Sequence, residues 1–411
     1  MNKIRIRADQ VSLGDHVPCD IYNADGKLLL KRGFRVDTDH QLERLLEEGH
    51  YDPSAVGPGG FGRGAHGGRE VHDMAQAPAR HPRTRVSIVA RLNAAVEKLD
   101  TLLASAPAAD VDFEAALRAI AADVRECCAL DSDAALAQIM LSASLRYSIR
   151  HQVNSAVLAA ILLSRLHHDE TKSAAAVAAA LTMNIGIVAL QDQLVGHKGG
   201  LNESQRTAIQ QHPTQSAQAL RSRGIHDAVW LQTVEQHHEA QDGTGYPGAL
   251  NAHQICREAQ IVSLADRYCA LVSTRAYRPA VAPRRAIKEM YDRAGKAIDA
   301  ALIKTLISAI GIFPPGAYVR LQNGETAVVV RRLLDPKHPV VFALHADTTA
   351  PYDPPRKRLT ASQRDYEIAS DVRPEAVRAK VDPEYLWPPS ATGETSAASA
   401  APAKNEPHPP G

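Results

Sequence analysis

The sequence has few features of secreted, membrane or nucleic-acid-binding proteins. Its five cysteines are odd in number and lack metal-finger spacing, which favours a reducing compartment over a disulfide framework. No long run of Lys or Arg occurs and the formal net charge is +1, so the electrostatic footprint of a nucleic-acid-binding or membrane-surface protein is missing. We therefore expect the partner to be a small molecule or another protein.

Signals for export and membrane insertion are also missing. The first residues, Met1–Arg7, interleave charged and apolar side chains and so lack the apolar core of a signal peptide. The longest apolar run, Ala156–Leu163, is much shorter than the about 20 residues that span a bilayer, and it predicts a buried helix. The sequence thus predicts a cytoplasmic protein with no membrane span, and it leaves peripheral attachment through a partner open.

The N-terminal part predicts a small α/β domain over residues 1–52. Two strands, 17–22 and 27–30, flank Asp25-Gly26, a pair typical of tight hairpins because glycine tolerates a positive φ. A helix with leucines at helical spacing is expected next, from about Thr38.

The composition then changes twice. Residues 53–83 are rich in Gly, Pro, His and Arg, which predicts a flexible linker because little apolar surface can be buried. From 84 to 312, Ala-rich and Leu-rich segments repeat with a period of 3.6, which predicts a helical domain. Three linker histidines are expected to be solvated rather than to bind metal: His66, His72 and His81.

Local signals divide the helical domain. Asn202–Gln205 predicts a capping box that starts a helix. His212-Pro213 should end or kink that helix, because proline removes an amide donor. A further helix is expected from about His226 to His238 and should stop at Asp242-Gly243.

Beyond residue 312 the hydrophobic period changes to two, which predicts a small β-rich unit over residues 313–375. Asn323-Gly324 is a strong hairpin signal between the first two of three predicted strands, 318–322, 326–330 and 339–344. The low-complexity tail, 388–411, is expected to be disordered. The fold class is thus mainly α, with a small α/β unit before the helical core and a small β unit after it.

Five polar side chains of the helical domain could converge on one metal site: His151, His212, His237, His238 and Asp266. Neutral imidazoles together with a carboxylate suit iron, manganese or zinc ions. Each histidine taken singly is equally compatible with a surface or hydrogen-bonded core position, so the residue types alone leave both interpretations open.

Several motifs in this region belong together. They are QHHEAQDGTGYPG at 236–248, LNESQ at 201–205 with the later His212-Pro213, IVSLADRY around Asp266, and STRAYRP at 273–279. Over about residues 147–310 they resemble the HD-GYP family, bacterial phosphodiesterases that hydrolyse cyclic di-GMP. The opening hairpin and the late β unit also resemble segments that flank this domain in some members.

The resemblance implies a helical HD-superfamily core in which His and Asp ligands hold two or three metal ions. A bridging hydroxide attacks the phosphorus while the metals stabilise charge on the phosphoryl oxygens. The bridging aspartate comes from the consecutive His-Asp pair of an HDIGK motif, which gives the superfamily its name.

The chain departs from the family pattern at that pair. The motif aligns with residues 183–187, where Met183, Asn184 and Ile187 replace histidine, aspartate and lysine. Asn184 has no charge with which to bridge two cations, and the thioether of Met183 is a poor ligand for hard ions. His167-His168-Asp169 lies too early in the sequence to replace the pair. Tyr147 stands where three-metal members carry glutamate, and Cys269 where many carry aspartate.

The remaining residues take roles by the same resemblance. His212, His237 and His238 imply a half-site for one divalent ion such as iron or manganese, with a metal-free hydrogen-bonded cluster as the alternative; His151 and Asp266 remain on the other side. The nucleotide-binding positions would be Arg275, Tyr277 and Arg278. The guanidinium groups of the two arginines match phosphoryl oxygens or else form surface or interhelical salt bridges. For the loop, the resemblance implies substrate-side positioning and docking onto a diguanylate cyclase (GGDEF) domain, through Gly243, Gly245, Tyr246 and Pro247.

The leading hypothesis is a catalytically impaired HD-GYP protein that binds cyclic di-GMP or docks a protein. The alternative is an active phosphodiesterase with one metal at the three histidines and water activated by Asp266 or Glu239. A scaffold that binds neither metal nor nucleotide is the third hypothesis.

Overall fold

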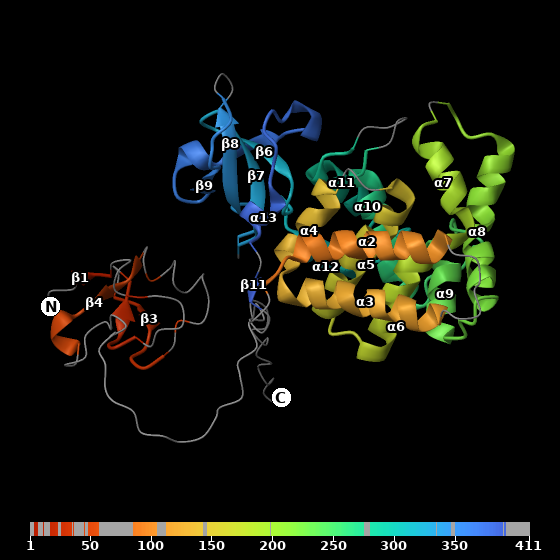
Figure 1. The fold of residues 1–411 in the computed structure, drawn as a ribbon, viewed down its shortest axis with the longest axis horizontal. Helices are drawn as coiled ribbons and strands as arrows, with labels where there is room; N and C mark the ends of the chain where they lie inside the picture. The colour runs from red at the N-terminus through yellow and green to blue at the C-terminus, as the bar shows by residue number, and fades with distance from the viewer. Residues whose placement is uncertain are drawn as a thin grey trace, which may run out of the picture. The chain divides into compact units, whose positions relative to one another are not determined.

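The computed structural model divides the chain into two compact units, Met1–His81 and Pro82–Gly411, which are described separately. Figure 1 labels their helices and strands. The structure describes residues 4–6, 11, 17–23, 26–34, 36, 45, 48–56, 85–104, 112–142, 146–197, 199–274, 280–333, 335–346, 350–388 and 390–391.

The N-terminal unit contains a four-stranded antiparallel sheet in the order β1-β4-β2-β3. Its strands are β1 (Ile4–Arg5), β2 (Ile21–Tyr22), β3 (Leu28–Leu30) and β4 (His50–Tyr51), and the short turn η1 (Pro53–Ala55) follows. Gly26 has φ +84 in the β2–β3 connection, so the predicted hairpin is confirmed, with shorter strands. Most of the helix expected after Thr38, and all of the linker beyond residue 56, lie outside the described residues.

The second unit is built around a helical core, as predicted. Its helices are α2 (Ile88–Ala104), α3 (Phe113–Leu130), α4 (Ser132–Leu141), α5 (Tyr147–Arg165), α6 (Glu170–Thr182), α7 (Val188–Val195), α8 (Glu203–Arg221), α9 (Ala228–Gln236), α10 (Arg257–Val272), α11 (Pro283–Tyr291) and α12 (Ala300–Ile310). The 3-10 turn η2 (Ile185–Ile187) lies between α6 and α7. Aspartates accept backbone N–H bonds at several helix starts, as Asp112, Asp169, Asp227 and Asp299 do.

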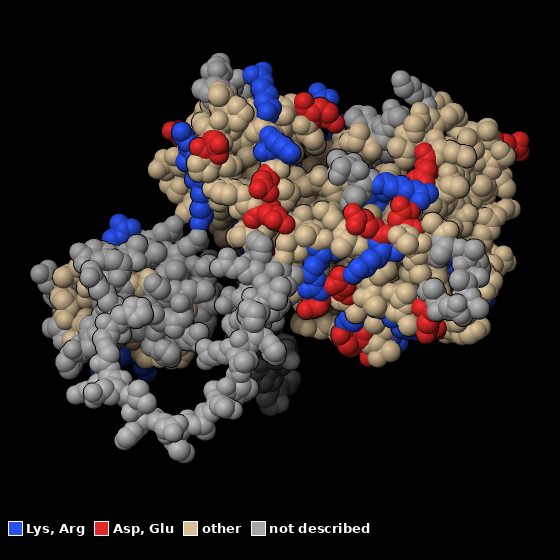
Figure 2. Space-filling view, viewed as in Figure 1, with Lys and Arg blue, Asp and Glu red and all other residues tan. Residues whose placement is uncertain are grey.

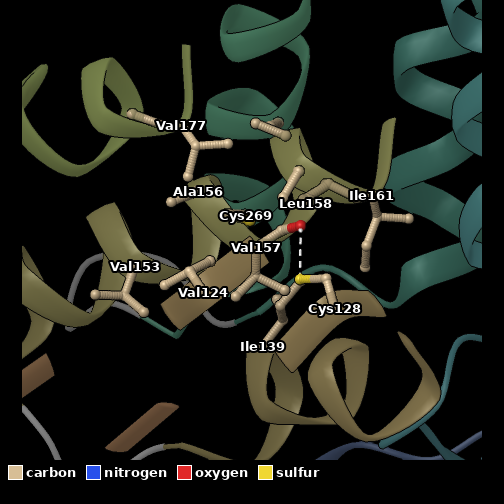
Figure 3. Packing of buried hydrophobic residues seen from close by; sticks show 14 of the residues in the cluster. Val124, Cys128, Ile139, Val153, Ala156, Val157, Leu158, Ile161, Val177 and Cys269 are labelled. Carbon is tan, nitrogen blue, oxygen red and sulfur yellow. Dashed lines mark hydrogen bonds between the residues drawn. The ribbon is translucent and has the colours of Figure 1, made fainter. Parts of the chain in front are cut away.

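Helix α5 lies at the centre of this core. Residues of all its turns are buried, and Figure 3 shows Val153, Val157 and Ile161 packed among apolar side chains of neighbouring helices. The thiol of Cys128 donates to the Val157 carbonyl at 3.6 Å. The run predicted as a buried helix, 156–163, is therefore confirmed. A different stretch, Glu170–Val195, is long and apolar enough to cross a membrane by length and composition, but 67% of its most apolar window is buried inside the fold.

Helix α8 corrects one prediction and confirms another. Asn202 accepts from the Gln205 amide at 2.8 Å while the Gln205 side chain accepts from the Asn202 amide, which confirms the capping box. The helix does not end at Pro213 but runs through it to Arg221. The amide lost at Pro213 is compensated by a side chain, which is described with the site below.

A five-stranded antiparallel sheet follows the helices, in the order β10-β6-β7-β8-β9. The hairpin of β6 (Tyr318–Leu321) and β7 (Glu325–Arg331) and the third strand β8 (Val340–Ala346) confirm the predictions. Sequence reasoning missed β9 (Arg356–Leu359) and β10 (Ile368–Asp371). Short elements complete this part: η3 (Arg364–Tyr366), η4 (Pro374–Ala376) and α13 (Pro383–Leu386).

The sheet is joined to the helical core through both apolar and charged contacts. Along β7 the side chains alternate, because Val329 packs within the sheet's own cluster while Val328 and Val330 join the helical cluster. The Arg332 guanidinium contacts Asp133, Ser132 and the Ala309 carbonyl. This sheet is therefore part of the second unit rather than an appendage to it. On the face shown in Figure 2, basic and acidic side chains are interspersed over the helical core.

The C-terminal segment contributes two further contacts. Trp387 is buried and donates from its indole N–H to the Val330 carbonyl at 3.0 Å. Within the stretch predicted to be disordered, β11 (Ser390–Ala391) pairs with β5 (Arg85–Val86). The remaining tail, from residue 392, lies outside the described residues.

Candidate metal centre and Gly-Tyr-Pro loop

The candidate site lies where several helices meet. His151 is on α5, His212 on α8, Asp266 on α10, and His237 and His238 follow the end of α9. A buried hydrogen bond ties α9 to the end of α6, because the Trp230 indole donates to the Thr182 hydroxyl at 2.9 Å. The residue after Thr182 is Met183, so this bond also fixes the positions of Met183 and Asn184, where the family resemblance expects the His-Asp pair.

Three of the five predicted ligands come together. One donor atom each from His212, His237 and His238 lies within 4.8 Å of the others, and we call these residues the three-histidine set. The Nε2 atoms of His212 and His237 are 3.2 Å apart. His212 and His237 are buried and His238 is half-buried.

The backbone selects the tautomer of two of these rings. His212 Nδ1 lies 2.6 Å from the Ile209 carbonyl, and His237 Nδ1 lies 2.7 Å from the Val234 carbonyl. A carbonyl oxygen only accepts, so each Nδ1 carries the proton and each Nε2 presents a lone pair. Pro213 explains why Ile209 is available, since it has no N–H to donate to the carbonyl four residues earlier.

The three rings are held in their neutral form. Burial lowers the pKa of His212 to about 3, and the nearby His237 adds to the effect. Burial also lowers the pKa of His237, and it lowers that of His238 well below the ordinary histidine value. Neutral imidazole is the form that binds a metal ion.

The facing Nε2 atoms therefore fit a cation. Two lone pairs at 3.2 Å repel each other unless a positive charge lies between them. A proton is disfavoured by the lowered pKa values, and the opposite tautomer would turn a lone pair toward a carbonyl oxygen. With metal–nitrogen bonds of about 2.1 Å and roughly right-angled to tetrahedral geometry, ligand nitrogens stand about 3.0–3.4 Å apart, which matches the observed spacing.

The other two predicted ligands form a separate pair. His151 Nε2 lies 2.7 Å from Asp266 Oδ1, and both side chains are buried. Burial alone would raise the pKa of Asp266, but the hydrogen bond and charge interaction with His151 hold that pKa below its ordinary value. The ring of Tyr147 stacks on His151 with centroids 5.6 Å apart. The five predicted ligands thus form two groups, the three-histidine set and the pair of His151 and Asp266.

The two residues at which the resemblance expects the His-Asp pair lie beside α8. Met183 and Asn184 are buried, and the amide of Gly186 donates to the hydroxyl of Ser216, one turn after His212, at 3.0 Å. A side chain at Gly186 would place its Cβ 3.1 Å from that hydroxyl, which explains the glycine. The early His-His-Asp stretch has other partners, because Asp169 caps α6 and His168 pairs with Glu258 at 2.8 Å.

The Gly-Tyr-Pro loop folds back onto the ligand histidines. The Tyr246 ring stacks on His238 with centroids 4.8 Å apart, and the Tyr246 amide donates to the His238 carbonyl at 3.2 Å. Gly243 has φ +76, and a Cβ at Gly245 would lie 2.3 Å from the Ala240 amide nitrogen. These two positions therefore require glycine for different reasons, backbone conformation and close approach.

Sequence reasoning missed the principal contact of this loop. Glu239 is buried, and its two carboxylate oxygens accept from the amides of Gly248 at 2.6 Å and Leu250 at 2.9 Å. The sequence, in which Glu239 directly follows the two histidines, suggested it as a base and did not indicate these bonds. The proposed phosphate contacts Arg275, Tyr277 and Arg278 lie outside the described residues.

Comparison with known proteins shows which family the sequence of this region resembles. Residues 135–302 match the family model of the HD domain. This match and the relatives described next confirm the resemblance of this part of the chain to the HD domain and, within that class, to the HD-GYP family. A cyclic di-GMP phosphodiesterase of Pseudomonas aeruginosa is 30% identical over 223 residues, which cover 53% of this chain and 54% of that protein. A cyclic di-GMP phosphodiesterase of Borreliella burgdorferi is 28% identical over 187 residues, covering 46% and 49%.

Among solved structures, an HDG"Y"P protein from Bdellovibrio bacteriovorus aligns with a TM-score of 0.47 at 14% identity, covering 75% of this chain and 99% of that one. The chain spans about half the length of the curated relatives described above.

Proposed function

We propose that this chain is a catalytically impaired HD-GYP protein that acts in cyclic di-GMP signalling by binding the nucleotide or docking a protein. One observation carries the proposal. Met183 and Asn184, both buried, stand where the family resemblance expects the bridging dyad, while the three-histidine set and the Gly-Tyr-Pro loop are present. The names of the relatives, cyclic di-GMP phosphodiesterases, suggest the nucleotide.

The loss of the dyad limits what the site can do. When bound, a divalent ion polarises phosphoryl oxygens and acidifies water, and two ions together stabilise both the attacking and the leaving oxygen. Asn184 has no charge to bridge two ions. Asp266 is the carboxylate whose charge acts on the three histidines, and its Oδ1 is already bonded to His151. The residues thus fit one ion rather than a bridged pair.

The donor set also bears on which ion would bind. His212, His237 and His238 offer three imidazole nitrogens, and such donors suit zinc and iron better than manganese in the usual order of divalent affinities. A single iron or zinc ion on the three-histidine set is therefore the occupancy that we propose.

An active phosphodiesterase with one metal is the second candidate, and the fixed tautomers of the three-histidine set favour it. It requires a base to activate water. Both oxygens of Glu239 accept loop amides, and Asp266 is bonded to His151. Because both candidate bases are already engaged, we rank regulation above hydrolysis. The GGDEF-domain protein is the proposed docking partner, and Arg275 and Arg278 are the proposed phosphate contacts.

Calorimetric titration of the metal-loaded chain with cyclic di-GMP tests the proposal, with chromatography of the recovered nucleotide. We expect saturable binding and intact nucleotide, and weaker binding by an Arg275→Ala/Arg278→Ala variant. Recovery of linear product would support the phosphodiesterase instead. A chain that binds neither cyclic di-GMP nor a GGDEF-domain protein would be a scaffold, and the proposal would fail.

A further inference from the structure

Glu239 is placed to connect the metal ligands to the loop. It directly follows His237 and His238 and is only 5% exposed. Its oxygens accept from two different loop amides, Gly248 at 2.6 Å and Leu250 at 2.9 Å. Hydrogen bonds to an ionised acceptor are roughly twice as strong as neutral ones. The carboxylate therefore fastens the far end of the loop to the segment that carries the ligands.

Two further contacts fasten the near end of the loop to the same segment. Tyr246 stacks on the ring of His238 and donates its amide to the His238 carbonyl. Gly245 lies so close to Ala240 that no side chain fits between them. Three consecutive residues, 238 to 240, are thus each covered by the loop, so the His238 ring cannot reorient without disturbing the loop.

We infer that Glu239 is a positioning residue that couples metal occupancy of the three-histidine set to the conformation of the loop at 243–250. The inference rests on the proposed metal binding. An ion that fixes the His238 ring also fixes the Tyr246 ring stacked on it, and Glu239 transmits that order to Gly248 and Leu250. By linkage, whatever holds the loop in this conformation tightens metal binding by the same factor.

The two hydrogen bonds that Glu239 accepts from the loop require a carboxylate. Two N–H groups arrive from different residues, and each needs an acceptor oxygen. Glutamine has the same shape but only one oxygen, so its NH₂ group would face an N–H donor. Glu239→Gln therefore removes one hydrogen bond and creates a repulsion without changing the volume of the side chain.

The loop supplies a matched control at its other end. The Asp242 carboxylate accepts from the amide of Thr244 at 3.1 Å and from its hydroxyl at 2.6 Å, both within the loop itself. Both bonds go to the same oxygen, Oδ1, so Asp242→Asn changes a carboxylate to an amide that can keep them, and it does not touch a ligand segment. Tyr246→Ala is a second test, because it removes the ring on His238 and leaves both Glu239 bonds in place.

The experiment is hydrogen exchange by mass spectrometry over residues 243–250 of the full chain, with zinc(II) or with chelator, beside zinc titrations. In the natural chain zinc should slow exchange in the loop. In Glu239→Gln the zinc-loaded loop should exchange as fast as the zinc-free loop, and zinc affinity should fall by about 10-fold. Asp242→Asn should keep natural affinity, and Tyr246→Ala should keep a protected loop that no longer responds to zinc.

Each way of failing has its own signature. A natural chain that takes up no zinc or iron would refute the proposed metal site and the coupling with it. A natural chain that binds zinc with unchanged loop exchange would refute the coupling alone. Natural zinc affinity in Glu239→Gln, or an equal loss in Asp242→Asn, would refute the role of Glu239.

Discussion

Pro213 destabilises helix α8 but helps to orient the ligand His212, and both effects can be measured. It lies inside α8, where it leaves the Ile209 carbonyl without a backbone donor, and His212 Nδ1 donates to that carbonyl at 2.6 Å. Pro213→Ala would restore an amide that competes for the same oxygen. The hydrogen bond from His212 Nδ1 to the Ile209 carbonyl would weaken. The orientation of the ring, and with it the position of Nε2 as a metal ligand, would then be less fixed.

Pro213→Ala should therefore stabilise the fold and weaken metal binding. Proline in a helix interior costs about 3 kcal/mol relative to alanine. Pro213 is buried, and removing about two methylenes forfeits roughly 1.6 kcal/mol at about 0.8 each. We therefore expect Pro213→Ala to raise the free energy of unfolding by about 1.4 kcal/mol. Because partners of metal ligands are typically worth about 10–100-fold in affinity, zinc binding should weaken by that order.

Urea unfolding gives the first quantity, and zinc titration against a competing chelator gives the second. Gln210→Ala, at an exposed position of the same helix, is the control and should leave zinc affinity unchanged. A more stable Pro213→Ala variant with natural zinc affinity would refute the assigned role of the proline. A variant that loses both stability and affinity would show that the ring is needed for packing instead.

Three further predictions concern the rest of the molecule. In urea unfolding, Arg332→Ala should lose about 3 kcal/mol because a largely buried ion pair is broken, whereas the more exposed Arg331→Ala should lose under about 1 kcal/mol. Burial opposes ionisation of Glu325, yet hydrogen bonds from Arg358 hold its pKa below the ordinary value. Its stabilisation is thus present above that ordinary value and is lost as pH falls through the folded pKa, so Glu325→Gln should cost more at pH 7 than at pH 3. Zinc at about 100 times its dissociation constant adds about 2.7 kcal/mol, which for roughly 300 folded residues raises Tm by about 4 °C, and His237→Ala should abolish this rise.

Much of the fold could be predicted because its signals are local. The capping box at Asn202 and the hairpin at Asn323-Gly324 each depend on residues within a few positions of one another. Strand β9 was missed because its sequence, Arg-Lys-Arg-Leu, lacks apolar alternation and is specified by pairing with β8. The pairing of β5 with β11 joins segments about 300 residues apart, which no local pattern reports.

The site likewise has features that the sequence predicted and features that depend on the folded chain. Residue types predicted histidines that converge, and three of them do. The family resemblance predicts that Met183 and Asn184 replace the dyad. These two signals did not predict that Pro213 would leave the Ile209 carbonyl to His212, since that depends on the helix continuing through the proline. They also suggested a chemical role for Glu239, whereas its oxygens are bonded to loop amides whose positions only the folded chain defines.

Hydrolysis of cyclic di-GMP tests the proposed impairment most directly. The natural chain would be compared with a Met183→His/Asn184→Asp/Ile187→Lys variant, each loaded anaerobically with iron(II) or manganese(II). We predict an inert natural chain and turnover by the variant, since the missing carboxylate would return beside an intact three-histidine set. Turnover by the natural chain, abolished by His237→Ala, would contradict the proposal and show that one half-site suffices.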